Sequence, residues 1–143
     1  MASRLKPTIL CVDDQWSGLI GRKTLLENNG YQVLEATDGS EGLRLFLSHS
    51  LDAVVLDYQM PGMNGDVVAA KMKRAKSYVP IMLLSSYGPL PKSKLEAIDI
   101  FLSKSQSPKV LLSSLQHLVN RRPKPFFSRW FDTWRSRTEG IRQ

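Results

Sequence analysis

The stretch Ala53-Val-Val-Leu-Asp57-Tyr-Gln-Met-Pro-Gly-Met-Asn-Gly65 passes from a short apolar run into an aspartate and then into a loop of turn-forming residues. Every residue of the run before the aspartate is apolar, which is typical of a strand that helices cover on both faces. After the loop the chain becomes amphipathic up to Lys76. This order of strand, loop and helix predicts one unit of a parallel α/β sheet.

The rest of the chain repeats this alternation of apolar runs and amphipathic segments, and so predicts a doubly wound α/β domain. An apolar run is expected to form a strand at each of the following places: Thr8–Val12, Tyr31–Glu35, Ala53–Leu56, Ile81–Leu84 and Ile100–Leu102. Helices are expected between and after these strands, over Trp16–Asn28, 38–48, 64–76, 92–97 and a last segment that begins at Ser107 and Pro108.

The length and composition suit one domain with a tail, because the chain has 143 residues of which 42% are hydrophobic. No apolar run approaches the roughly 18 residues of a membrane span, and the first residues lack the apolar stretch of a secretory signal. These features favour a cytoplasmic protein. The single cysteine, Cys11, lies within an apolar run and is expected to pack as a small buried hydrophobe.

The net charge of +7 is concentrated near the C-terminus. Residues 1–120 hold 13 lysines and arginines against 11 acidic residues, whereas residues 121–143 hold 7 against 2. We therefore expect a nearly balanced domain over 6–120 and a basic tail over 121–143. The tail also contains aromatic residues that would share one face of a short helix: Phe126, Phe127, Trp130, Phe131 and Trp134.

A helix as short as this tail is marginal by itself and needs a surface to pack against. The surface is expected to be its own domain, a second copy in a homodimer, a membrane surface, or a groove of a partner protein. The tail is too short to hold a DNA-binding domain of ordinary size. Output through protein contacts is therefore expected.

Polar residues follow four of the predicted strands at the point where each strand ends. Asp13 and Asp14 follow the first strand, Asp57 the third, Ser85 the fourth, and Lys104 lies two residues beyond the fifth. Ligands of doubly wound sheets bind at the carboxyl ends of the strands, so these side chains are expected to converge there. Taken alone, Asp13 and Asp14 could equally cap the following helix.

Three carboxylates at one edge of a sheet repel each other, since two unit charges about 4 Å apart cost about 4 kcal/mol at an effective dielectric constant of about 20. A divalent cation removes this cost. Mg²⁺ prefers one or two carboxylates with carbonyl and water oxygens, which Asp14, Asp57 and a carbonyl of the following loop can supply. Such a site favours phosphoryl transfer to a carboxylate nucleophile, with Lys104 and Ser85 near the phosphoryl oxygens.

These residues resemble the receiver domains of two-component response regulators over about 6–120. The resemblance rests on the segments Ile9-Leu-Cys-Val-Asp-Asp14, Ala53–Gly65, Ile81-Met-Leu-Leu-Ser-Ser86 and Phe101-Leu-Ser-Lys104. It implies a flavodoxin-like fold with five strands in the order 2-1-3-4-5 and five helices. It also implies phosphorylation by a histidine kinase or phosphotransfer protein, and a signalling role rather than classical enzyme activity.

The resemblance assigns a role to each matching residue. Asp57 resembles the phosphoacceptor, Asp14 and the carbonyl of Gln59 resemble the direct Mg²⁺ ligands, and Asp13 resembles the acid that holds the metal through water. Ser85 and Lys104 resemble the residues that contact the phosphoryl group. Phe101 stands at the position of the family's switching aromatic, which turns inward after phosphorylation draws the hydroxyl of Ser85 toward the phosphoryl group.

Two departures from the family pattern concern the fifth strand and the segment before it. The family usually places a proline after the lysine, with a cis peptide between them, whereas Ser105 follows Lys104 here. The segment from Ser85 to Lys104 is also about one helical turn shorter than usual. The output and dimer face of the domain is therefore expected to be altered.

Two other classes of function are compatible with parts of the sequence. A phosphorylation-independent interaction module would keep the fold and act through the aromatic tail. A phosphatase with a carboxylate nucleophile is disfavoured, because Asp57-Tyr58-Gln59 lacks a second acid two residues after the nucleophile.

Overall fold

A computed structural model describes residues 5–121. Its five strands form one parallel sheet in the order β2-β1-β3-β4-β5, as the resemblance implies. The strands are β1 (Thr8–Val12), β2 (Gln32–Ala36), β3 (Ala53–Asp57), β4 (Ile81–Ser85) and β5 (Ile100–Ser103). Strands β1, β3 and β4 are central and almost wholly buried, which agrees with their apolar sequences.

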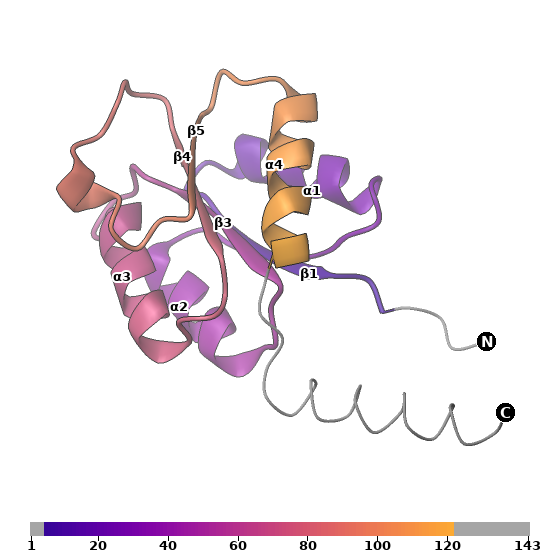
Figure 1. Cartoon of the computed structure of the whole chain (residues 1–143), viewed down its shortest axis with the longest axis horizontal. Coiled ribbons are helices and arrows are strands. Elements are labelled where there is room, and N and C mark those ends of the chain that lie inside the picture. Colours follow the sequence, from indigo (N-terminus) through magenta and orange to yellow (C-terminus); the bar gives the residue numbers. More distant parts are fainter. Residues whose placement is uncertain (1–4, 122–143) are drawn as a thin grey trace, which may run out of the picture.

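Helices cover both faces of this sheet (Figure 1). They are α1 (Trp16–Glu27), α2 (Gly39–Ser48), α3 (Gly65–Ala75) and α4 (Pro108–Arg121), with one turn of 3₁₀ helix, η1 (Lys92–Lys94). Helices α2 and α3 lie on one face, and α1 and α4 lie on the other. The polypeptide therefore has the doubly wound architecture that the alternation of segments predicts.

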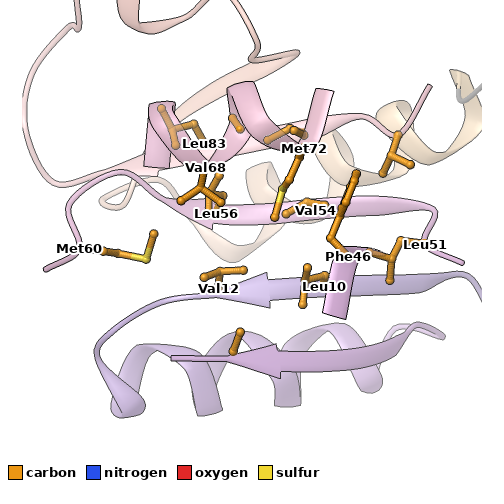
Figure 2. Close-up of a cluster of buried hydrophobic side chains, with 14 residues drawn as sticks. Leu10, Val12, Phe46, Leu51, Val54, Leu56, Met60, Val68, Met72 and Leu83 are labelled. Atoms are coloured by element: carbon orange, nitrogen blue, oxygen red, sulfur yellow. The ribbon is translucent and has the colours of Figure 1, made fainter. Parts of the chain in front are cut away.

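The two faces of the sheet have separate hydrophobic clusters, because successive residues of a strand point to opposite faces. Leu10 and Val12 of β1 pack with the side chains of α2 and α3, and Figure 2 shows them gathered with Val68 and Met72. Ile9 and Cys11 point the other way, into the cluster of α1 and α4. Cys11 is fully buried, as expected, and burial raises the pKa of its thiol to about 12.

The helix predicted over 92–97 is wrong, and the described part of the chain has four α-helices instead of five. Only the single turn η1 forms there. Pro89 and Pro91 lack backbone N–H groups, and too few residues remain before β5 for a stable helix. The segment still buries apolar side chains against the α2 and α3 face of the core: Leu90, Leu95, Ala97 and Ile98.

Several other elements differ from the prediction by one residue; strands β3, β4 and β5 each end one residue later than predicted. The second strand begins and ends one residue later than predicted, at Gln32 and Ala36. No peptide bond within residues 5–121 is cis, so Lys104 and Ser105 are joined by a trans bond.

The predicted tail lies outside the described residues, apart from Arg121 at the end of α4. The expectations for a tail helix, a homodimer and membrane contact therefore stay predictions. No helix within residues 5–121 is long and apolar enough to cross a membrane.

Candidate functional site

The backbone places the predicted site residues along one edge of the sheet. Hydrogen bonds continue the ladders just beyond the strands, from the Asp13 N–H to the Ala36 carbonyl (3.1 Å) and from the Lys104 N–H to the Ser85 carbonyl (2.9 Å). Asp57 is the last residue of β3 and pairs with Leu84 of β4. Because all strands run parallel, the carboxyl ends of β1, β3 and β5 meet here.

Three carboxylates converge at this edge. Asp13, Asp14 and Asp57 each offer a ligand oxygen, and these oxygens all lie within 4.8 Å of one another. Asp13 and Asp57 are buried, whereas Asp14 is exposed to solvent. The donor set is all oxygen and carries excess negative charge, so it fits a hard divalent cation such as Mg²⁺.

A cavity of about 550 Å³ opens over these carboxylates. Asp14 and Asp57 line it together with Gln59 from the loop after β3 and Lys104 from the loop after β5. The cavity is largely polar in character and offers room for a hydrated cation beside a phosphoryl group. The structure thus brings Asp14, Asp57, Gln59 and Lys104 into one site, as the sequence predicts.

Glycine is required at the turn that forms the wall of this cavity. The N–H of Gly65 donates to the Tyr58 carbonyl at 2.6 Å and so folds the loop back toward the end of β3. A Cβ at position 65 would lie 2.3 Å from the carbonyl oxygen of Asp57, which is closer than any packing allows. The loop can therefore fold back this closely against the end of β3 only when residue 65 has no side chain.

Lys104 is the cation nearest to the central carboxylate. Its Nζ lies 3.0 Å from Asp57 Oδ1 and 3.4 Å from Asp13 Oδ2. Burial raises the pKa of Asp57 above its ordinary value; Lys104 opposes this shift, and the neighbouring Asp14 adds to it. Lys104 therefore favours the ionised form of a carboxylate that burial disfavours.

Arg22 of α1 is a site residue that the sequence interpretation missed. Its guanidinium Nη2 forms an ion pair with Asp13 Oδ2, and only 15% of its side chain is exposed. The other oxygen of Asp13 accepts a hydrogen bond from the Gln15 N–H at 2.8 Å. The sequence contained a signal for this position. Residue 22 lies three residues after Leu19 and four before Leu26, both buried, and hence on the inner face of α1.

Ser85 and Phe101 lie beside the site rather than in it. Ser85 is buried, and its hydroxyl accepts a hydrogen bond from the Tyr87 N–H at 3.0 Å. Its neighbour Ser86 lines the cavity instead. Phe101 lies on β5, partly buried against the core cluster of α2 and α3.

Comparison with known proteins supports the resemblance to receiver domains of response regulators. A family model described as "Response regulator receiver domain" matches residues 9–116. A probable transcriptional regulator, ycf27, of Cyanophora paradoxa is 34% identical over 126 residues, which are 86% of this chain and 52% of that protein. Response regulator SaeR of Staphylococcus aureus is 32% identical over 120 residues, 81% of this chain and 52% of that one.

Solved structures of response regulator proteins are similar in fold to this chain. A CheY-like receiver domain protein of Methanospirillum hungatei superposes with a TM-score of 0.78 at 26% identity, covering 82% of this chain and 97% of its own. The response regulator TrrA of Thermotoga maritima, solved with Mg²⁺ and BeF, gives a TM-score of 0.75 at 32% identity, covering 78% and 98%.

This chain spans about half the length of the curated relatives above. The family match, by contrast, covers most of this chain and includes the acidic cluster, the central aspartate and the lysine. The chain therefore belongs to the response regulator receiver domain family.

Proposed function

We propose that this domain is the phosphoacceptor of a two-component phosphorelay and that Asp57 receives a phosphoryl group from a partner histidine kinase or phosphotransfer protein. The observation that carries the proposal is the position of the Asp57 carboxylate. It lies on a cavity of about 550 Å³, within 4.8 Å of the ligand oxygens of two other acids and 3.0 Å from the Nζ of Lys104.

In this proposal Asp14, Asp57 and the carbonyl of Gln59 hold Mg²⁺ directly, and Asp13 holds it through water. When bound, the metal neutralises the charge that develops on the phosphoryl oxygens. An oxygen of Asp57 forms a bond to phosphorus while the bond between phosphorus and the donor nitrogen breaks and leaves its electron pair on the imidazole. Lys104 stays close enough to pair with a phosphoryl oxygen on Asp57.

The same proposal gives Ser85 and Phe101 the role of a switch. The Ser85 hydroxyl now accepts from the Tyr87 N–H, so its movement toward a phosphoryl group would release this turn. Ser85 pairs with Ser103 of β5, two residues after Phe101. A movement at Ser85 therefore acts on the strand that carries Phe101, and the altered surface signals through contacts with a downstream protein.

A cytoplasmic location is part of the proposal. It is supported by the free, buried Cys11, which is ordinary for a protein of a reducing compartment.

The proposal is tested with beryllofluoride, which mimics a phosphoryl group on a carboxylate. Trp16 is 58% exposed and follows Gln15, which lines the cavity, so its fluorescence is expected to change when beryllofluoride and Mg²⁺ are added together. Asp57→Asn should abolish the change, and Trp16→Phe should remove only the part that Trp16 reports. A response that survives in Asp57→Asn, or no response in the wild type, would contradict the proposal.

A further inference from the structure

Both oxygens of the Asp13 carboxylate already have partners within the protein. Its Oδ1 accepts from the Gln15 N–H at 2.8 Å, and its Oδ2 contacts both the Arg22 guanidinium and the Lys104 Nζ, the latter at 3.4 Å. The side chain of Asp13 is 1% exposed. A metal-bound water that is to reach Asp13 therefore competes with these partners for the carboxylate oxygens.

Arg22 changes the charge balance of the site by one unit. The three carboxylates carry three negative charges, and Lys104 and Arg22 contribute two positive charges. The net charge of the site without metal is therefore −1. A divalent cation would then make the site positive. Without Arg22, the same cation would neutralise it. Like charges at close range repel strongly in a partly buried site, so Arg22 opposes the metal.

The path of the Arg22 side chain is kept open by Gly18, one turn earlier on α1. A Cβ at Gly18 would lie 3.3 Å from Asp13 Oδ2 and 3.5 Å from Arg22 Nη2. The first distance is tight and the second is an ordinary van der Waals contact, so a side chain at position 18 would press mainly on the Asp13 carboxylate. Glycine at this position leaves room around the ion pair.

The guanidinium also has space into which it can withdraw. A second cavity of about 550 Å³ lies between α1 and α4, and Arg22 lines it together with Gly18, Gly21 and Leu111. A rotation of the side chain into this cavity would release Asp13 without a movement of α1. Lys104 lines this cavity as well, so the cavity adjoins the site at its edge.

From these contacts we infer that Arg22 is a built-in competitor of the divalent cation: it pairs with Asp13 when the metal is absent and thereby weakens the binding of Mg²⁺. The inference rests on the proposed function, since it assigns Arg22 a part in the metal site described there. Arg22 is in this account a positioning residue. It sets the concentration of Mg²⁺ at which the domain becomes competent for phosphoryl transfer.

The test is the dissociation constant of Mg²⁺, measured by isothermal titration calorimetry at constant pH and ionic strength. Arg22→Met keeps an apolar stem of similar length and removes the charge, so it is expected to bind Mg²⁺ on the order of tenfold more tightly than wild type. Arg22→Lys keeps the charge without the guanidinium and should fall between the two. Arg44→Met is the matched control, because it also removes one positive charge, from an exposed pair with Glu41 on α2.

The Tm of thermal unfolding, with and without Mg²⁺, provides a second measurement of the same effect. Arg22→Met leaves the buried Asp13 with one cation fewer, so it should be less stable than wild type without metal and should gain more in Tm on addition of Mg²⁺. If Arg22→Met is unfolded without metal, Mg²⁺ should refold it at concentrations at or below those that saturate the wild type.

Equal or weaker binding of Mg²⁺ by Arg22→Met, or an equal gain in Arg44→Met, would overturn the inference and leave the proposed function intact. Failure of the wild type and of every variant to bind Mg²⁺ would overturn the proposed function together with the inference. Tighter binding in Arg22→Met alone supports both.

Discussion

At Asp57, burial and a nearby positive charge shift the pKa of the carboxyl group in opposite directions. Its side chain is 4% exposed, and burial raises its pKa, while Lys104 at 3.0 Å acts in the opposite direction. The folded protein therefore binds the Asp57 proton more tightly than the unfolded chain does. The ionised form that phosphoryl transfer needs is the form that costs folding stability, and a bound cation would offset this cost.

This opposition predicts how stability depends on pH. Because the pKa of Asp57 is raised on folding, its contribution to stability is full below the ordinary value of 3.8 and is lost as pH rises through the higher folded value. Asp57→Asn should therefore unfold at a higher temperature than wild type at pH 7 without metal, and the difference should vanish below about pH 4. Differential scanning calorimetry at several pH values measures it.

The control for this measurement is Glu96→Gln, which removes a carboxylate at an exposed position. It should leave Tm nearly unchanged at every pH. The contradicting result is a Tm of Asp57→Asn that is lower than that of wild type at pH 7, by a difference that does not depend on pH. It would show that the amide disrupts the site and that burial of the Asp57 charge is not the main effect on stability.

The sequence predicts most of the site at this scale, because strand ends can be located from the apolar runs. Asp13, Asp14, Asp57 and Lys104 each follow such a run, and the structure brings all of them together. Arg22 was missed because it lies on a helix, where its approach to Asp13 depends on the rotation of α1 against the sheet. The spacing places residue 22 on the inner face of α1 but does not give this contact.

Two glycines, one in α1 and one at the start of α3, show how differently one residue type is used. Gly21 lies in the interior of α1, and a Cβ there would meet nothing within 4 Å. Gly65 begins α3, and a Cβ there would lie 2.3 Å from the Asp57 carbonyl oxygen. The first glycine costs helix stability without a compensating contact, whereas the second is required by close packing.

Gly21→Ala should therefore stabilise the domain by about 0.5–1 kcal/mol, because alanine loses less backbone freedom on folding. Gly65→Ala should destabilise it by about 2 kcal/mol or more, because the loop must move away from the end of β3. Urea unfolding at equilibrium, followed by far-ultraviolet circular dichroism, gives both free energies. The reverse order of the two variants would contradict this assignment of the glycines.

Helices α2 and α4 have side-chain caps and begin where the sequence predicts, whereas the segment 92–97 has no such cap and forms no α-helix. Asp38 caps α2 by accepting from the Glu41 N–H at 2.8 Å, and Ser107 precedes α4 with its hydroxyl accepting from the Val110 N–H at 3.3 Å. The segment 92–97 is short, two prolines precede it and β5 follows closely. It forms the single 3₁₀ turn η1, and the apolar residues on either side of this turn pack on the core.

At the scale of the whole molecule, the order of the strands could be expected only through the family resemblance. Alternating apolar and amphipathic segments predict a parallel sheet, but several strand orders satisfy that pattern. The observed order places β1 and β3 side by side at the centre. This pairing makes the acids after β1 neighbours of Asp57 and so creates the site.

The central claim is that this edge of the sheet is a magnesium-dependent phosphoacceptor site. The most direct measurement is mass spectrometry of the protein after incubation with Mg²⁺ and acetyl phosphate, followed by peptide mapping. We expect one added phosphoryl group, carried by the peptide that contains Asp57, and none when Mg²⁺ is chelated or Asp57 is replaced by Asn. A phosphoryl group on another residue, or none on the wild type at saturating Mg²⁺, would contradict it.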